Sequence, residues 1–396
     1  MHDALGKGTV LGYCTNVHAG ATWERTRSNL RTHAVAVKQR VSPDGPMGVG
    51  LWLSADAART VLEAGAAESL RDFLGAEGLL AYTFNGFPWG DFHQPIVKHR
   101  VYAPDWSDSD RVAYTKDLIA ILACLLPEDS LEGSISTLGV GWHSIAADQG
   151  RLRRAVENLL GVAAHLKRLE EATGVLIHLD LEPEPGCYLQ RARDVVAFFS
   201  RHLIPASRGI EIARYLRVCH DICHAAVMFE EPKELFGLYD AAGIAIGKVQ
   251  ISSGLRVRFD DLEESDRAAA LGQLGSFREP RYLHQTVIRR RDGVVFHEDL
   301  PDALAGSEPA GEWRVHFHVP INLDRIALLG TTQREIGRSI ALLRDRGVRH
   351  WEVETYAWDV LPPPLGVDTL AEGIARELKW LLDLSGDPTV LPGRGT

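Results

Sequence analysis

The sequence predicts a (β/α)8 TIM barrel, an α/β fold in which eight parallel strands alternate with helices around one core. Apolar strand-like runs alternate with amphipathic helix-like stretches through most of the 396 residues. Four of the later runs also carry an oxygen donor at or near their end, namely Glu182, Asp221, Gln250 and Glu354. Because such a barrel collects its functional side chains at the carboxyl ends of its strands, both observations favour the same fold.

The first half of the chain supplies four strand candidates, over residues 9–16, 47–54, 79–85 and 133–138. Between the first two, a helix is expected over 22–41, because Thr22 can cap its amino end and Glu24 lies in its first turn. Ser54 is placed in the same way before an alanine-rich helix. An apolar helix over 111–126 precedes the fourth strand.

The second half continues this alternation. A helix over 152–173 leads through Gly174 into a fifth strand that ends at Glu182, where a Pro-Glu-Pro-Gly sequence stops it. The remaining strands are expected over residues 216–220, 245–252 and 350–356. Helices over 232–242 and 332–346 lie between them, which completes eight strands for one closed parallel barrel.

A long insertion separates the seventh strand from the eighth, because residues 254–328 are too many for one crossover. It contains a helical part over 263–274, a β-hairpin that turns around Arg291-Asp-Gly, and an alternating run over 313–320. We expect residues 1–396 to form a single domain in which this insertion covers the mouth of the barrel. A small additional domain is the alternative.

The composition narrows the class of protein. A formal net charge of −10 argues against a general nucleic-acid binder, because phosphate affinity needs clustered Lys and Arg. Five scattered cysteines predict reduced thiols rather than a disulfide framework. No apolar stretch approaches ~20 residues and no signal core begins the chain, so we expect a cytoplasmic protein without a membrane span. The chain could form a homodimer, but no residue in the sequence specifies one.

The choice between neighbouring acidic residues follows from strand parity and position. Glu182 ends its strand, whereas Glu184 is flanked by prolines and lies beyond the strand end. Glu352 and Glu354 share one face, and Glu354 lies nearer the carboxyl rim. Three carboxylates and one amide oxygen favour one divalent ion, Mn²⁺, Mg²⁺ or Co²⁺, over a structural zinc site. Zinc itself stays open as the ion.

This ligand set predicts chemistry on a small polyhydroxylated metabolite. Two neighbouring substrate oxygens would complete the coordination of the ion, which would polarise a carbonyl. Glu182 and Glu354 would each exchange a proton with the substrate carbon from opposite sides. Transfer between adjacent carbons gives isomerisation, and return to the opposite face gives epimerisation, both through an enediolate.

Further polar residues are candidate substrate contacts. His224 lies three residues after Asp221, on the same side of the turn, where it can reach a substrate oxygen. Arg256 lies six residues after Gln250 and can hold the same oxygens. A purely structural role is the alternative for both residues. The remaining candidate substrate contacts are Asn85, His18 and His318, and the same alternative applies to them.

At these residues the chain resembles the xylose isomerase-like TIM-barrel superfamily. Its sugar isomerases and epimerases are similar in carrying a Glu, an Asp-x-x-His, a His or Gln, and a final Glu on successive late strands. The resemblance implies metal binding by Glu182, Asp221, Gln250 and Glu354, and substrate contact by His224 and Arg256. Lys248 departs from the pattern, because many relatives have histidine there. Apurinic endonucleases share the superfamily, but the acidic chain lacks their basic surface.

Over nearly its whole length the chain also resembles the EboE proteins, which are described as metabolite-traffic proteins of the ebo gene cluster. The segments that carry this resemblance are residues 13–18, 83–88, 101–106, 133–137, 181–187 and 316–320. It implies a keto-cyclitol or sugar-like ligand. The alternative to an isomerase or epimerase is therefore a non-catalytic binding or trafficking protein that keeps the barrel metal site.

Overall fold

The computed structural model describes residues 8–127, 132–362 and 369–386. The prediction that no signal core begins the chain concerns residues 1–7, which lie outside the described residues. Within the described ranges, no helix combines the length and the apolar character that crossing a membrane requires.

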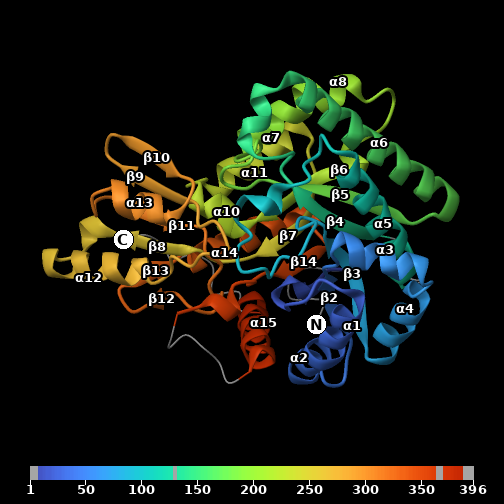
Figure 1. Ribbon diagram of the computed structural model, residues 1–396, viewed down its shortest axis with the longest axis horizontal. Helices are drawn as coiled ribbons and strands as arrows, with labels where there is room; N and C mark the ends of the chain where they lie inside the picture. Colours follow the sequence, from blue (N-terminus) through green and yellow to red (C-terminus); the bar gives the residue numbers. More distant parts are fainter. Residues whose placement is uncertain (1–7, 128–131, 363–368, 387–396) are drawn as a thin grey trace.

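Eight parallel strands form a nearly closed barrel, which confirms the predicted fold (Figure 1). They are hydrogen-bonded in the order β1-β14-β7-β6-β5-β4-β3-β2, so the last strand of the chain lies beside the first. An isolated bridge between Cys14 and Gly50 joins the two ends of this sheet. The strands are β1 (Val10–Tyr13), β2 (Met47–Leu51), β3 (Leu79–Asn85), β4 (Glu132–Leu138), β5 (Leu176–Glu182), β6 (Leu216–Asp221), β7 (Ile246–Ile251) and β14 (His350–Val353).

Several of these strands end earlier than the sequence predicted, and a polar contact accompanies the end of β2. The strand expected to continue to Ser54 ends at Leu51, where the backbone N–H of Trp52 donates to Thr15 Oγ1 at 2.9 Å. The strand expected to continue to Tyr356 ends at Val353. Polar residues just past the strands are thereby free to line the carboxyl end of the barrel.

Helices surround the barrel and bury its outward apolar side chains. The predicted caps are present, since Thr22 Oγ1 accepts from Arg25 N at 3.3 Å and Ser54 Oγ accepts from Ala57 N at 3.1 Å. The helices are α1 (Trp23–Asn29), α2 (Val35–Val41), α3 (Ala55–Glu63), α4 (Ala67–Ala76), α5 (Ser109–Leu125), α6 (Gln149–Thr173), α7 (Ala192–Phe198), α8 (Ile204–Ala206), α9 (Ile212–Tyr215), α10 (Ile222–Val227), α11 (Pro232–Ala242), α14 (Gln333–Leu343) and α15 (Leu370–Gly386). One π-helical turn, Leu30–Ala34, joins α1 to α2 within the helix predicted over 22–41.

The chain between β7 and β14 builds a second, antiparallel sheet in the order β10-β9-β11-β8-β13-β12. Figure 1 shows it beside the barrel, in yellow and orange. Its elements are β8 (Leu255–Arg258), α12 (Glu264–Gly275), β9 (Thr286–Arg290), β10 (Gly293–His297), α13 (Leu300–Gly306), β11 (Glu312–Val315), β12 (Arg325–Ile326) and β13 (Leu329–Thr331). The predicted hairpin is present, with Gly293 opposite Arg290.

The apolar core of this second sheet continues into the barrel loops. Trp313 and Phe317 pack in one cluster with Trp52, Phe92 and Tyr356, which follow the barrel strands β2, β3 and β14. Because one apolar cluster includes both parts, burial of these side chains stabilises the sheet against the carboxyl end of the barrel.

The strand predicted over 313–320 is wrong in its second half. β11 ends at Val315, and the chain continues irregularly because its backbone bonds leave the sheet ladder. The N–H of His316 donates to Gln285 O at 2.9 Å, and that of Val319 donates to Ser253 O at 2.9 Å. As a result, His316 and His318 lie at the barrel rather than on a polar face of the sheet.

Candidate metal centre

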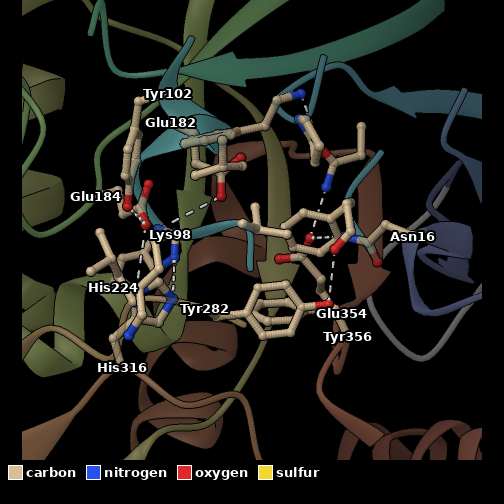
Figure 2. A pocket seen from close by; sticks show the side chains of 17 residues that line it. Asn16, Lys98, Tyr102, Glu182, Glu184, His224, Tyr282, His316, Glu354 and Tyr356 are labelled. Atoms are coloured by element: carbon tan, nitrogen blue, oxygen red, sulfur yellow. Dashed lines mark hydrogen bonds and ion pairs between the residues drawn. The ribbon is translucent and has the colours of Figure 1, made fainter. Parts of the chain in front are cut away.

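A pocket opens at the carboxyl ends of the barrel strands, with a volume of about 510 Å³ when its open mouth is included. Asn85 and Glu182 end strands β3 and β5, and Asn16 and Glu354 follow β1 and β14. Tyr282, Leu283 and His316 reach the same pocket from the segment between β8 and β13 (Figure 2). The other lining residues are Phe87, Pro88, Phe92, Val97, Lys98, Val101, Tyr102, Glu184, His224 and Tyr356.

The predicted metal ligands come together at this end of the barrel. Asp221 is the last residue of β6, and in the parallel register it lies opposite Gln250 of β7. Glu182 and Asp221 each place a carboxylate oxygen within 4.8 Å of the other and of a nitrogen of His224. The distances are 3.7 Å from His224 Nδ1 to Glu182 Oε1 and 3.9 Å from His224 Nε2 to Asp221 Oδ1.

Several oxygens in this group lack a hydrogen-bond partner among the described residues. They are Glu182 Oε2, Asp221 Oδ2 and Gln250 Oε1, and all three side chains are buried. A buried oxygen without a partner is costly, and buried carboxylates normally pair with a cation. The residues present therefore fit a divalent ion, which prefers oxygen donors of this kind.

The electrostatics of the carboxylates agree with that fit. Burial raises the pKa of Glu182, and the neighbouring charges of Glu354 and Asp221 raise it further. Burial also raises the pKa of Glu354, again with a contribution from Asp221. Three like charges that disfavour one another in a buried site are stabilised together by one positive ion.

Two asparagines orient Glu354. Asn16 Nδ2 and Asn85 Nδ2 both donate to Glu354 Oε1, at 2.8 and 2.7 Å. Asn85, a predicted substrate contact, lines the pocket and also donates to the carboxylate of Glu354. The other oxygen, Oε2, lies 3.8 Å from His318 Nδ1. The direction of this carboxylate is therefore fixed by two amides, one just after β1 and one at the end of β3.

Glu184 lies past the end of β5, as the sequence indicated, and yet it lines the pocket. Tyr102 OH donates to its Oε1 at 2.8 Å, and Gln285 Nε2 donates to the same atom at 3.2 Å. Burial raises the pKa of Glu184 to about 8. Sequence reasoning missed Tyr102, in the 3-10 turn Lys98–Tyr102, and Gln285, just before β9, because only long-range folding brings them to Glu184.

His18 and Arg256 are predicted substrate contacts that the structure does not bring to this pocket. His18 Nε2 lies 2.9 Å from Tyr13 OH, and its ring stacks on His33 with the centroids 4.6 Å apart. Arg256 belongs to β8, where its Nε donates to Glu312 Oε1 at 3.0 Å. Antiparallel pairing of β8 with β11 sets this contact, which six residues of sequence spacing could not reveal.

His318 is buried beside the ligands, where its Nδ1 donates to the backbone oxygen of Glu354 at 2.8 Å. Its Nε2 lies 4.0 Å from Asp221 Oδ2. It forms two further groups of neighbouring donor atoms, one with His224 and His316 and one with Asp221 and Cys223. The sequence placed His318 at the site as a substrate contact, and the structure places it among donor atoms.

No family model and no curated protein matches the chain. Among solved structures, a xylose isomerase-like TIM barrel protein from Mycobacterium smegmatis in complex with magnesium is 13% identical, with a TM-score of 0.51, over 98% of this chain and 99% of that chain. The probable 3-DHS dehydratase AsbF, involved in petrobactin synthesis in Bacillus anthracis, is 12% identical, with a TM-score of 0.48, over 94% and 98%. The IOLI protein with a binding zinc atom is 10% identical, with a TM-score of 0.48, over 95% and 98%. Together with the strand order, the first of these likenesses shows that the chain has the xylose isomerase-like TIM-barrel fold.

Proposed function

We propose that the protein is a divalent-metal-dependent isomerase or epimerase of a sugar, a keto-cyclitol or a related polyhydroxylated metabolite. One observation carries the proposal. Glu182, at the end of β5, and Glu354, just after β14, line the same pocket from different parts of the barrel. They lie next to buried oxygens that lack a partner in the described chain. Two carboxylates that flank one carbon can remove a proton from one face and return it to the other.

The residues that would hold the ion are Glu182, Asp221, Gln250 and Glu354. When bound, a divalent ion polarises a substrate carbonyl and favours loss of a proton from the neighbouring carbon. The solved Mycobacterium smegmatis structure with the same fold is in complex with magnesium, which supports an ion of this class here. The donor set, with its three carboxylates, is consistent with Mn²⁺, Mg²⁺ or Co²⁺.

The side chains of the chain itself would position and move the proton. Glu354 keeps a fixed direction because Asn16 and Asn85 hold its Oε1. Glu182 has two carboxylate oxygens, so one could bind the ion while the other takes or returns the proton. One carboxylate would remove the proton and the other would return it to the adjacent carbon or to the opposite face.

The walls of the pocket would exclude water from this transfer. Phe87, Tyr102, Tyr282 and Tyr356 line it and present apolar ring faces. Exclusion of water strengthens every charge interaction inside the site and protects a reactive intermediate. We include in the proposal that the insertion 254–328 covers the barrel mouth, since Tyr282, Leu283 and His316 from it line the pocket.

A metabolite-binding protein without catalysis is the second candidate. The segments that resemble EboE proteins, 83–88 and 181–187, supply Asn85, Phe87 and Glu184 to the pocket. The resemblance and the pocket thus concern the same residues, which favours a sugar-like or keto-cyclitol ligand. Neither of them names a reaction, and a carrier would use the same ligands and the same metal.

Proton exchange in deuterium oxide tests the proposal. The protein is loaded with Mn²⁺ and incubated with a panel of ketoses and keto-cyclitols, and deuterium at the carbon next to the carbonyl is measured by NMR. We expect exchange with at least one compound, and a loss of about 10²-fold or more in Glu182→Gln and in Glu354→Gln. Glu298→Gln is the matched control, because Glu298 is an exposed glutamate outside the ligand set.

The outcomes separate the two candidates. Exchange that persists in Glu182→Gln and Glu354→Gln at the wild-type rate would reject the proposed mechanism. Binding of a compound, seen by calorimetry, without exchange at any carbon would leave the carrier as the function. Circular dichroism of each variant confirms that its fold is retained.

A further inference from the structure

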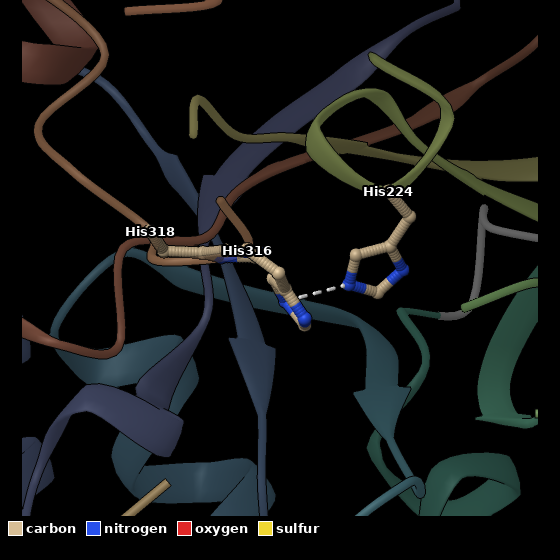
Figure 3. A group of neighbouring side chains, drawn as sticks. All are labelled: His224, His316 and His318. Carbon is tan, nitrogen blue, oxygen red and sulfur yellow. Dashed lines mark hydrogen bonds between the residues drawn. The ribbon is translucent and has the colours of Figure 1, made fainter. Parts of the chain in front are cut away.

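Three buried histidines converge beside the ligands described above. His224 comes from α10, and His316 and His318 come from the irregular segment after β11 (Figure 3). The distance from His224 Nε2 to His316 Nε2 is 3.1 Å, and that from His316 Nε2 to His318 Nε2 is 3.2 Å. One nitrogen from each ring lies within 4.8 Å of the other two.

The opposite nitrogen of every ring is committed as a donor. His224 Nδ1 faces Pro183 O at 3.0 Å, and His318 Nδ1 faces Glu354 O at 2.8 Å. Both partners are backbone carbonyls, which only accept, so both Nδ1 atoms carry the proton. A neutral imidazole has one N–H, and its Nε2 is then a bare lone pair.

The third ring, that of His316, also donates from Nδ1, but to the oxygen of a side-chain amide. His316 Nδ1 lies 2.7 Å from Gln285 Oε1. The orientation of that amide is determined, because Gln285 Nε2 donates to the backbone carbonyl of Pro185 at 3.0 Å. The amide oxygen therefore faces His316, whose Nδ1 must donate, and its Nε2 is also left as a lone pair.

The lone pair of His316 faces those of His224 and His318 at hydrogen-bond distance, and lone pairs so opposed repel unless a cation lies between them. A single proton can be shared by only one pair of nitrogens, so the third lone pair would stay opposed. All three rings are buried, so water cannot separate the opposed lone pairs. A metal ion, in contrast, accepts all three lone pairs at once.

We propose that His224, His316 and His318 form a nitrogen-rich cation site for Zn²⁺, beside the oxygen-rich site of the barrel strands. Zinc binds imidazole nitrogen at roughly 2.0–2.1 Å in tetrahedral geometry, which places neighbouring nitrogens about 3.3 Å apart. The two Nε2 separations of 3.1 and 3.2 Å are close to that value. Each ring also donates its other N–H to an oxygen, as zinc-bound histidines usually do.

This site goes beyond the proposed reaction and has a different donor chemistry. Three protein nitrogens leave one coordination position open, as in catalytic zinc sites. His224 and His316 line the pocket, so the ion would lie at its wall and give the pocket a second electrophile. Asp221 lies between the two donor sets, with Oδ1 3.9 Å from His224 Nε2 and Oδ2 4.0 Å from His318 Nε2.

Anomalous scattering on the unmodified protein is the direct test. Crystals of the full chain are stripped with a chelator, soaked with Zn²⁺ and measured on both sides of the zinc absorption edge. We expect a peak at roughly 2.0–2.1 Å from Nε2 of all three histidines. Absence of a peak between these rings at saturating zinc would overturn the inference, whatever occupies the carboxylate site.

Zinc content of variants provides the second test. Elemental analysis after zinc loading and gel filtration should show one equivalent fewer in His316→Gln and in His318→Gln than in the wild type. His99→Gln is the matched control, because His99 is an exposed histidine paired with Glu298 and should leave the content unchanged. Equal zinc content in all four proteins would overturn the inference.

The two proposals fail in distinguishable ways. If Glu182→Gln and Glu354→Gln abolish Mn²⁺-dependent proton exchange while His316→Gln keeps the zinc content of the wild type, the reaction stands and the histidine site is rejected. If proton exchange is absent in every protein while His316→Gln and His318→Gln lose one zinc, the histidine site stands alone.

Discussion

Lys248 Nζ lies 2.6 Å from Glu352 Oε2 inside the barrel, and neither side chain has any exposed surface. Each residue lies two positions before a proposed metal ligand: Lys248 before Gln250 on β7, and Glu352 on β14 before Glu354, which follows that strand. The pair therefore forms a charged layer directly below the pocket. Gly50 makes room for it, because a Cβ there would come within 1.3 Å of Glu352 Oε1.

Replacement of Lys248 with Met should destabilise the fold by roughly 3–5 kcal/mol, because it leaves the buried carboxylate of Glu352 without its cation. The double variant Lys248→Met/Glu352→Gln should recover much of that loss, since no charge remains unpaired. Lys167→Met, which removes an exposed i,i+4 pair with Glu171, is the control and should cost less than about 1 kcal/mol. Urea unfolding measures all three. A cost for Lys248→Met no larger than that of the control would contradict this account.

Removal of bound metal should lower the thermal stability. Glu182, Asp221 and Glu354 are buried together, and an ion that binds only the folded state offsets the cost of their charges. At a metal concentration of about 100 times Kd, the expected stabilisation is roughly 2.7 kcal/mol. Calorimetry of the chelated protein with increasing Mn²⁺ should show a rising Tm, with a smaller rise in Asp221→Asn. A Tm that does not respond to Mn²⁺, Mg²⁺, Co²⁺ or Zn²⁺ would argue against any metal centre.

Glu377 should make stability depend on pH. Its carboxylate is buried and accepts from Thr355 Oγ1 at 2.6 Å, Ile321 N at 2.9 Å and Trp358 Nε1 at 3.0 Å. Burial outweighs these donors and raises its pKa from 4.5 to about 7. Because the folded pKa is the higher one, the contribution is fully present below pH 4.5 and is lost as the pH rises through 7. The rise corresponds to roughly 3 kcal/mol.

The comparison of wild type with Glu377→Gln isolates this effect, since other groups titrate equally in both proteins. The free energy of unfolding of the wild type, relative to the variant, should fall between pH 4.5 and pH 8. Urea unfolding at four pH values in that range measures it. A difference that stays constant with pH would show that Glu377 is ionised in the folded protein throughout.

Arg256→Met should leave metal binding and proton exchange unchanged, although the sequence placed Arg256 at the substrate. In the structure its partner is Glu312, which also accepts from Arg289 at 3.1 Å and from Arg314 at 2.8 Å. Since Arg289 and Arg314 keep their hydrogen bonds to Glu312, the loss of unfolding free energy should be about 1 kcal/mol or less. A loss of proton exchange in this variant, with metal still bound, would show that Arg256 does contact the substrate.

The barrel and the positions of the proposed oxygen ligands at its strand ends were predictable because both follow from local patterns. Apolar runs that alternate with amphipathic helices define parallel strands, and parallel strands bring their carboxyl ends to one side. Glu182 and Asp221 are the last residues of their strands, so their position in the sequence already predicts that they lie at the carboxyl end of the barrel. Glu354 follows β14 by one residue for the same reason.

The remaining part of the site depended on how the chain between β7 and β14 folds back, which no local pattern encodes. His316 and His318 alternate as a polar face of a strand would, and only the bonds of His316 to Gln285 O and of Val319 to Ser253 O turn them toward His224. Arg256 lies outside the pocket for a related reason, because the pairing of β8 with β11 brings its side chain to Glu312. The sequence by itself thus determined the strands and the residues at their ends, through periodicity and residue type. The tertiary structure alone decided which distant side chains meet, because those contacts depend on long-range packing rather than on spacing along the chain.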